Sequence, residues 1–331
     1  MPRVSVAEAE RAAAACLARA GASPAMARAT AAACTAAEAM GQAGHGLSRI
    51  PQYAMLLRTG RADGSAVPRI VNERGGCCLI DAGGGLAYPA LRLAVEQAIA
   101  RAGAHGIAAV GVSESGHSGV SGLHVGAIAA AGLVGMMFTN SPAAMPLPGG
   151  RRPRLSTNPI AAAFPRADAA PIVVDLALSA TARGKIMVAA KEGRPIPAGW
   201  ALDAEGQPTT DAREALAGVM LAIGGERGLA LALVVELLAV ALTGAAFGWE
   251  ADSFFVETGN RPRLGQLLVA IDPAALAGSA AYLARVADLA AAAAEDGVRL
   301  PGARRDALAA RAAAEGITVA DALWAEITAG S

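Results

Sequence analysis

The chain has 331 residues, and its 28 Lys and Arg residues are balanced by 28 Asp and Glu residues, so the formal net charge is zero. This length suits one globular unit of one or two domains. Because no long basic run offers a footprint for a phosphate backbone, we expect no nucleic-acid partner. The four cysteines, Cys16, Cys34, Cys77 and Cys78, lack CxxC spacing and disulfide-framework density, which favours reduced thiols in a cytoplasmic protein.

The mean hydropathy of +0.41 raises the question of a membrane span. The best candidate is GLALALVVELLAVALTGAAFGW, residues 228–249, but Glu236 lies near its middle. A carboxylate in hydrocarbon costs about a few kcal/mol, and weakly hydrophobic alanine supplies much of the stretch. We therefore predict a buried helix of a soluble protein and no membrane partner. The N-terminus lacks the basic and apolar regions of a secretory signal, so secretion is not indicated.

The predicted elements change in type along the chain. Residues 1–60 carry two capped helical patterns, from Ser5 to Gly21 and from Ser23 to Gly41. Residues 77–180 then alternate helical stretches with the apolar runs CCLIDAGGG, GIAAVGVSES, GLVGMMFTNS and PIVVDLALS, which are typical of buried strands. The alternation predicts an α/β layer. From about Asp272 the chain returns to alanine-rich helices, and the absence of a fixed-period repeat argues against a solenoid.

The first candidate site is AGHGLSRIPQY, residues 43–53, in which His45 lies between two glycines. A lone histidine is more often structural than catalytic. Here, however, the glycines leave the backbone open to a ligand, and Arg49 is expected on the same helical face, four residues on. A guanidinium is the usual partner of a carboxylate, and histidine exchanges protons near neutral pH. The pair predicts a small carboxylic acid as substrate.

The second candidate is GVSESGHSGVSGLHVGAIAAAG, residues 111–132, a strand followed by a Gly/Ser-rich turn and a helix. The N–H groups of such a turn can hold a phosphate. The segment does not have the GxGxxG spacing, so it is not an ordinary Rossmann fingerprint. His117 and His124 lie seven residues apart without a cysteine or carboxylate at ligand spacing, and we predict no metal site.

The third group comprises STNPIAAAFP (156–165), PIVVDLALSATARGKI (171–186) and GRPIPAGWALDAEGQPTTD (193–211). Asp175 ends an apolar strand, where ligand sites of α/β sheets tend to lie. Arg183 and Lys185 follow within reach of a bound anion. The composition of the last stretch by itself favours an ordinary surface loop.

Together these segments, with LVVELLAVALTGAAFGWE and GQLLVAIDP, resemble the malate/L-lactate dehydrogenase family over nearly the whole chain. This family is distinct from the Rossmann lactate dehydrogenases and includes sulfolactate, ureidoglycolate and 2,3-diketogulonate enzymes and cyclic-imine reductases. The resemblance implies an α/β fold, with a non-Rossmann, mixed-sheet NAD(P)-binding domain and a helical domain formed from both chain ends. It also implies a homodimer. We expect a helical part at 1–70, the NAD(P)-binding domain at 71–270 and C-terminal helices at 271–331 that pack with the N-terminal part.

The resemblance also assigns roles to individual residues. His45 matches the family's proton donor, Arg49 matches the contact to the substrate carboxylate, and Tyr53 and Thr157 are expected to contact substrate. The cofactor, NAD or NADP, is expected at a larger set of positions. These are His117, Ser118, Gly119, Val120, Ser121, Gly122, Asp175, Leu176, Ala177, Arg183, Gly184, Glu226, Arg227 and, least securely, Arg304.

Two departures from the family pattern affect the expected substrate. The family usually has serine where this chain has Gly44, and the cyclic-imine reductases have an aspartate where this chain has Lys185. A cation near His45 lowers the histidine pKa, whereas a carboxylate raises it. We therefore place Lys185 among the catalytic residues, with a second anionic group as its expected partner, and the substitution disfavours imine reduction.

The sequence thus predicts an NAD(P)-dependent oxidoreductase that interconverts a small 2-oxo acid and its 2-hydroxy acid, of the malate, lactate or sulfolactate type. One alternative is reduction of a cyclic imino acid, piperideine- or pyrroline-2-carboxylate. A second is a non-catalytic relative that binds a ligand without turnover. The particular acid, the choice between NAD and NADP, the stereochemistry, the direction of flux and the effect of Gly44 stay open.

Overall fold

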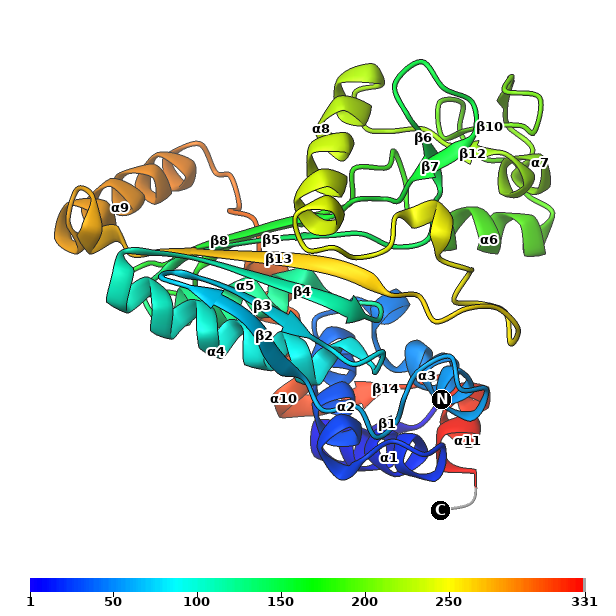
Figure 1. Cartoon of the computed structure of the whole chain (residues 1–331), viewed down its shortest axis with the longest axis horizontal. Coiled ribbons are helices and arrows are strands. Elements are labelled where there is room, and N and C mark those ends of the chain that lie inside the picture. The colour runs from blue at the N-terminus through cyan, green and yellow to red at the C-terminus, as the bar shows by residue number, and fades with distance from the viewer. Residues whose placement is uncertain (330–331) are drawn as a thin grey trace.

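The computed structural model describes residues 1–329, which are built around a seven-stranded mixed sheet (Figure 1). Its strands, in spatial order, are β2 (Arg69–Arg74), β3 (Cys77–Asp81), β4 (Ile107–Ser115), β13 (Leu264–Ile271), β5 (Val134–Thr139), β8 (Ile160–Phe164) and β9 (Ile172–Leu176). Strands β3 and β4 are parallel, and the other neighbours are antiparallel. This order confirms the predicted mixed sheet, because a doubly wound Rossmann sheet would be mostly parallel.

Helices α4 (Ala87–His105) and α5 (Ser121–Ala130) cover one face of the sheet (Figure 1). Their small apolar side chains pack against alternate residues of β3, β4, β5, β8 and β13 and form one buried core. Successive side chains of a strand point to opposite faces of the sheet. In β3, Cys78 is accordingly buried and Cys77 is exposed, as predicted for a strand at these positions.

The two chain ends meet in a second, helical core below the sheet in Figure 1. Strand β1 (Arg3–Val4) pairs with β14 (Ile317–Thr318), so the ends are joined by backbone hydrogen bonds. The helices around this core are α1 (Val6–Arg19), α2 (Pro24–Ala39), α3 (Ile50–Arg58), α10 (Ala303–Glu315) and α11 (Asp321–Thr328). Ser5 and Ser23 cap α1 and α2, as predicted, by accepting the N–H groups of Glu8 and Met26. Helix α9 (Ser279–Glu295) instead projects from the body and has no buried residue.

A third core lies on the other side of the sheet, in the excursion between β5 and β13. Its elements are β6 (Met145–Pro146), β7 (Pro153–Leu155), α6 (Arg183–Glu192), β10 (Ala201–Leu202), β11 (Pro208–Thr209), α7 (Ala212–Ala217), β12 (Val219–Met220) and α8 (Glu226–Glu236). Strands β10, β11 and β12 form a small sheet of their own, and β10 and β11 enclose part of the Pro/Gly-rich stretch expected to be a loop.

The apolar stretch at 228–249 is not one wholly buried helix, so that expectation was wrong. Helix α8 ends at Glu236 and continues as a π-helical turn, Leu237–Ala241, with one face open: Leu231, Val234 and Leu237 are each more than two-fifths exposed. The opposite face packs in the third core, which buries Glu236 to 1% exposure. Within residues 1–329 no helix combines the length and the apolar character that crossing a membrane requires.

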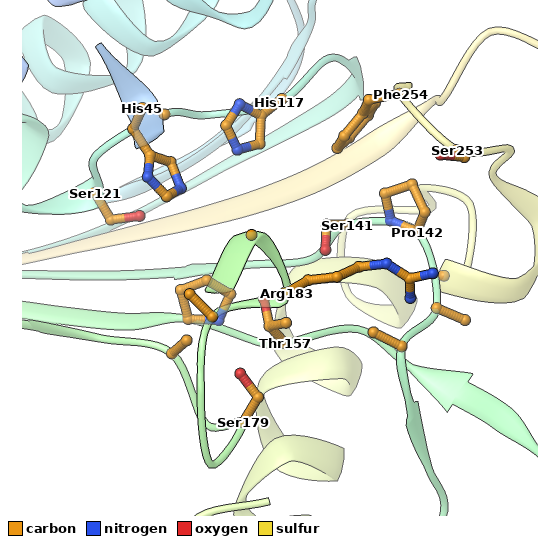
Figure 2. Close-up of a pocket in the computed structure, with 18 of the residues that line it drawn as sticks. His45, His117, Ser121, Ser141, Pro142, Thr157, Ser179, Arg183, Ser253 and Phe254 are labelled. Atoms are coloured by element: carbon orange, nitrogen blue, oxygen red, sulfur yellow. The ribbon is translucent and has the colours of Figure 1, made fainter. Parts of the chain in front are cut away.

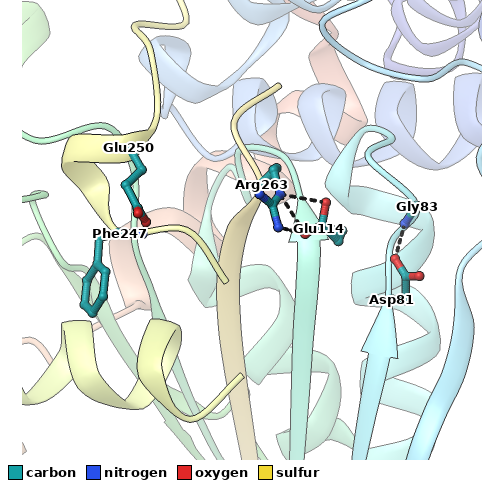
Figure 3. A network of polar contacts seen from close by, with 6 residues as sticks. All are labelled: Asp81, Gly83, Glu114, Phe247, Glu250 and Arg263. Atoms are coloured by element: carbon teal, nitrogen blue, oxygen red, sulfur yellow. Dashed lines mark hydrogen bonds and ion pairs between the residues drawn. The ribbon is translucent and has the colours of Figure 1, made fainter. Parts of the chain in front are cut away.

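Polar contacts fix the strand ends that face the helical core (Figure 3). Arg263, just before β13, donates to both carboxylate oxygens of Glu114 on β4, at 2.8 and 3.0 Å. Both residues have positive φ angles, 49° and 50°, so the ion pair forms where the backbone of each strand turns. Asp81 at the end of β3 accepts the Gly83 N–H at 2.8 Å. None of these four residues lines the cavity described next.

Candidate active site

A cavity of about 520 Å³ lies where the helical core, the sheet and the third core meet (Figure 2). The structure brings twelve of the predicted site residues to its wall. They are His45, Arg49, Thr157, His117, Gly119, Val120, Ser121, Asp175, Leu176, Ala177, Arg183 and Gly184. These residues come from segments separated by up to about 140 positions in the chain, and only folding makes them neighbours.

The other predicted site residues do not line this cavity. Two are buried behind its wall, Tyr53 at 1% and Ser118 at 3% exposure, and the N–H of Gly122 is bonded to the Asp175 carboxylate. The rest are exposed away from the lining: Lys185, Glu226, Arg227 and Arg304.

The spacing of His45 and Arg49 predicted that they share one helical face. The structure shows that they do not. They lie in two consecutive 3₁₀ turns, η1 (Ala43–His45) and η2 (Leu47–Arg49), that Gly46 separates with non-helical angles of φ −91° and ψ −139°. Glu38 on α2 accepts the Leu47 N–H at 2.9 Å. A side chain at Gly46 would overlap that carboxylate and lie 3.0 Å from the Glu38 Cα. The glycine is therefore required so that α2 can hold the turn that presents His45.

The electrostatic setting keeps His45 neutral in the free protein. Burial lowers the pKa of its imidazole, and the nearby Arg49 guanidinium lowers it further, to about 4. The predicted cation effect is thus present, but it comes from Arg49, since Lys185 is not among the causes. A bound carboxylate beside Arg49 would offset that positive charge and raise the His45 pKa. Binding of an acid and uptake of a proton are therefore coupled at this site.

The Arg49 side chain is held in place by hydrogen bonds that use only some of its N–H groups. Its Nε donates to the Gly44 carbonyl at 2.7 Å, one terminal nitrogen donates to Gln52 Oε1 at 2.6 Å, and the guanidinium lies 5.2 Å from the centre of the Phe255 ring. A guanidinium has five N–H groups. Two are used in these contacts, which leaves the planar group held on one edge and able to bind a carboxylate.

A chain of buried hydrogen bonds leads from the protein interior to His117. Cys34 Sγ donates to Tyr88 Oη at 3.8 Å, Tyr88 and Tyr53 hydroxyls are 3.0 Å apart, and Tyr53 Oη is 2.7 Å from His117 Nδ1. The His117 ring stacks on His45, with ring centres 5.4 Å apart. Burial lowers the pKa of His117 well below its usual value. Tyr53, predicted as a substrate contact, thus bonds to a neutral imidazole of the cavity wall.

The strand-end wall holds the predicted carboxylate, Asp175, and an arginine that the sequence analysis did not name, Arg305. Asp175 Oδ2 accepts the Gly122 N–H at 2.9 Å and an Arg305 N–H at 3.5 Å, and Arg305 also donates to the Asp175 carbonyl at 3.1 Å. These contacts oppose the effect of burial, which raises the Asp175 pKa. Arg305 lines the cavity whereas the neighbouring Arg304 is exposed, because successive residues of a helix point roughly 100° apart.

The same wall has features that fit a phosphate-bearing cofactor. Gly119 has a φ of +68°, and a Cβ there would lie 2.5 Å from Tyr88 Oη, so only glycine allows this tight turn. The N-terminus of α5 follows, with no side-chain cap and with Ser121 on the cavity wall. A helix N-terminus favours an anion, and Arg305 lies close by because both contact Asp175.

Glu236 joins three segments of the wall beneath the surface. Its carboxylate accepts from Asn158 Nδ2 at 2.6 Å, from the Gly248 N–H at 3.1 Å and from Asn140 Nδ2 at 3.5 Å. Burial raises its pKa, and these donors oppose that shift. Thr157, Ser141 and Trp249, each adjacent to one of these donors, line the cavity. The sequence singled out Glu236 only as an obstacle to membrane insertion, so this role was not anticipated.

A further group of lining residues carried no sequence signal. Ser141 and Pro142 follow β5, and the 251–255 loop brings Phe254, labelled in Figure 2, to the cavity. Phe255 of the same loop also lines it. The Phe254 ring lies 5.3 Å from that of His117. No motif marks these positions, because what matters is the path of a loop. Among residues 1–329, no three His, Cys, Asp or Glu side chains are grouped so that they could hold a metal ion.

Comparison with known proteins gives the class to which this fold and site belong. The model of the family described as malate/L-lactate dehydrogenase matches residues 4–328. The chain is 48% identical, over 92% of its length and 91% of the relative's, to (2R)-3-sulfolactate dehydrogenase (NADP(+)) of Chromohalobacter salexigens. It is 40% identical, over 87% and 86%, to a Δ1-pyrroline-2-carboxylate/Δ1-piperideine-2-carboxylate reductase of Pseudomonas aeruginosa.

Solved structures give the same result. The Δ1-piperideine-2-carboxylate reductase of Pseudomonas syringae pv. tomato superposes with a TM-score of 0.93 at 36% identity, covering 99% of both chains. Sulfolactate dehydrogenase of Methanocaldococcus jannaschii gives 0.88 at 28% identity, covering 98% of this chain and 95% of the other. The chain belongs to the malate/L-lactate dehydrogenase family. The resemblance, the oxidoreductase class and the NAD or NADP cofactor expected from the sequence are thereby confirmed.

Proposed function

We propose that this enzyme interconverts a small 2-oxo acid and its 2-hydroxy acid with NADP(H), and that the acid is of the sulfolactate type. The observation that carries the proposal is the arrangement of His45 and Arg49, which line one cavity as a proton-exchanging group beside a carboxylate-binding group. The 48% identity to a sulfolactate dehydrogenase that uses NADP(+) supports the choice of acid and cofactor.

The chain's own groups bind the acid and move one proton. In the reducing direction Arg49 holds the substrate carboxylate through its free N–H groups, and Thr157, which lines the same cavity, offers a hydroxyl. With the carboxylate in place, protonated His45 donates its proton to the carbonyl oxygen at C2. In the oxidising direction, neutral His45 takes that proton from the hydroxyl, which suits its low pKa.

The cofactor supplies the hydride that C2 gains or loses, so that the 2-oxo acid, NADPH and one proton balance the 2-hydroxy acid and NADP⁺. We assign its binding to the wall formed by the 117–122 turn, Asp175 to Ala177, Gly184 and Arg305. Burial of the two reactants together would supply much of the rate, about 7–11 kcal/mol of barrier where positioning is favourable.

Reduction of cyclic imino acids is the second candidate, since several relatives at about 40% identity are named as such reductases. Lys185 does not count against it, because this cation is exposed outside the cavity lining and is not among the causes of the His45 pKa shift. The 2-oxo acid is favoured by the higher identity, 48%, to the sulfolactate dehydrogenase. Ligand binding without turnover is the third candidate, and it gives no reason for a histidine and an arginine to share the cavity.

The test is oxidation of NADPH and NADH, followed at 340 nm, with sulfopyruvate, pyruvate, oxaloacetate, 2-oxoglutarate and the two cyclic imines. We expect turnover of a 2-oxo acid, sulfopyruvate foremost, and loss of at least about 100-fold in kcat for His45→Gln, since general acid–base catalysis contributes about 10²–10⁴. His105→Gln is the matched control, because His105 is exposed at the end of α4. Turnover of imines alone, or an active His45→Gln variant, would contradict the proposal.

We further propose a cytoplasmic homodimer. Its four free cysteines support a reducing compartment. The open apolar face of α8 and its π-helical turn, with Leu231, Val234 and Leu237 exposed, supports association with a second copy. For the division of the chain, we propose a helical unit formed from residues 1–70 with α10 and α11, around the NAD(P)-binding unit at 71–270, while α9 of the expected 271–331 part lies apart from that helical core. Sedimentation velocity tests the dimer.

A further inference from the structure

Among the described residues, the cavity wall carries three arginines, and one of them has no polar partner. Arg49 bonds to Gly44 and Gln52, and Arg305 bonds to Asp175. Arg183 lines the cavity, but no hydrogen bond or ion pair of its side chain occurs within residues 1–329. We propose that Arg183 binds the second anionic group, a sulfonate, of the dianionic 2-oxo acid whose carboxylate Arg49 binds. This inference rests on the proposed function and names the residue that selects the substrate.

The place of Arg183 in the cavity favours the substrate over the cofactor phosphates. In Figure 2 the Arg183 side chain extends away from the side of the view on which His45 and Ser121 are drawn, towards the side on which Pro142 and Ser253 are drawn. Ser121, which marks the turn assigned to cofactor phosphate, is drawn on the opposite side of the same view. Arg183 is the first residue of α6, and the next residue, Gly184, belongs to the wall assigned to the cofactor, so the direction of the Arg183 side chain, not its element, distinguishes it.

The physical state of Arg183 explains why an anion would bind there. Its side chain is partly buried, and desolvation lowers the pKa of the guanidinium. A charged group that has lost water without gaining a partner is held at a cost in free energy. An anion that enters the cavity recovers part of that cost through charge-assisted hydrogen bonds. A neutral methyl group, as in pyruvate, recovers none of it.

The charge balance of the wall points the same way. The acidic side chains on it are Asp175, which is paired with Arg305, and Asp252, which is exposed and accepts the Asn260 N–H at 2.8 Å. Among the described residues no carboxylate forms an ion pair with Arg49 or Arg183, although the exposed Asp252 keeps its negative charge. A substrate with one carboxylate pairs with only one of the two arginines. A sulfonate presents three oxygens to the fork-shaped guanidinium. A dianionic acid therefore fits better than a cyclic imino acid.

The structure also explains why Lys185 is not this contact. Lys185 lies two residues after Arg183 on the same helix, roughly 200° further round, and it is exposed outside the cavity lining. Lys185 was expected to contact the second anionic group, and Arg183 was expected to contact the cofactor. We instead assign the contact to the second anionic group to Arg183.

The experiment measures kcat/KM for sulfopyruvate and for pyruvate, each with NADPH, in the full-length enzyme and in Arg183→Gln, Lys185→Gln and Lys191→Gln. Lys191→Gln removes an exposed charge from the last turn of the same helix and is the matched control. For Arg183→Gln we expect kcat/KM to fall on the order of 10- to 100-fold for sulfopyruvate, as for a lost charge-assisted bond. We expect a change of less than about 3-fold for pyruvate and for the KM of NADPH. Thermal unfolding confirms that each variant is folded.

Two results would overturn the assignment. Equal losses for both acids with a raised KM for NADPH would make Arg183 a cofactor contact, and a sulfopyruvate-selective loss in Lys185→Gln alone would restore Lys185. If the unmodified enzyme reduced only cyclic imines, the proposed function would be wrong. In that case, calorimetric titration of the NADP⁺-loaded protein with 3-sulfolactate still decides the inference: equal affinities with and without the Arg183 guanidinium would refute it.

Discussion

Substitution of Glu236 by glutamine should weaken both the fold and the activity, although Glu236 does not line the cavity. Its carboxylate accepts three donors: Asn158 Nδ2, the Gly248 N–H and Asn140 Nδ2. Glutamine keeps the shape but offers one oxygen, so an NH₂ group must face at least one of these donors. The residue is 1% exposed, and water therefore cannot replace the lost acceptor.

The size of the effect follows from the unsatisfied donor. A buried polar group left without its partner costs about 1–3 kcal/mol. Chains somewhat shorter than this one lose roughly 2–4 °C in Tm per kcal/mol, so we expect Tm to drop by about 2–12 °C. The three donors hold the segments that carry Thr157, Ser141 and Trp249. We therefore also expect kcat/KM to fall by about 10-fold or more, since misplacement of groups in an active site can lower the rate by about 10²-fold.

Differential scanning fluorimetry and steady-state kinetics on the same samples measure both effects. The matched control is Glu114→Gln, which breaks the more exposed ion pair with Arg263 (Figure 3). An exposed pair contributes about 0–1 kcal/mol, so the control should shift Tm by much less. If Glu236→Gln left both Tm and kcat/KM at the values of the control, Glu236 would not hold the wall together, and the reasoning from its hydrogen bonds would be refuted.

Two further predictions concern the turn that carries His45. In NMR titrations the His45 imidazole should ionise with a pKa of about 4. Arg49→Gln should raise that pKa but leave it below 6.5, because burial, the larger cause of the shift, remains. An unchanged pKa would mean that the guanidinium does not act on the ring. Gly46→Ala should lower kcat strongly, since its Cβ overlaps the Glu38 carboxylate, whereas Gly44→Ala meets nothing within 4 Å and should keep near-normal activity. Comparable kcat values for the two alanine variants would argue against the close approach of Glu38.

Much of the fold could be predicted because its signals are local. Ser5 and Ser23 cap helices where the sequence placed them, and the apolar runs of residues 77–180 became strands of one sheet. The stretch at 228–249 was misjudged for a physical reason. A helix rich in alanine and leucine is apolar on every face, and its sequence does not show which face the third core covers.

In the candidate site, too, residues within one short motif could be predicted, whereas those selected by helix packing could not. His45 and Arg49 could be named from one short motif, since a proton carrier and a carboxylate contact were four residues apart. The sequence could not decide between Arg304 and Arg305, or between Arg183 and Lys185, because neighbours on a helix point in different directions and the packing of α10 and α6 selects the one that reaches the cavity.

The sequence by itself determined the family, the mixed α/β class and the chemistry of the short motifs, because these depend on residue types and on spacings within single segments. Tertiary structure alone decided that Tyr53 lies behind His117 rather than against a ligand, that Glu236 joins three loops, and that Arg183 is left without a partner. Each of these depends on contacts between segments that are far apart in the chain. Such contacts are set by packing and by which polar groups remain to be satisfied once water is excluded.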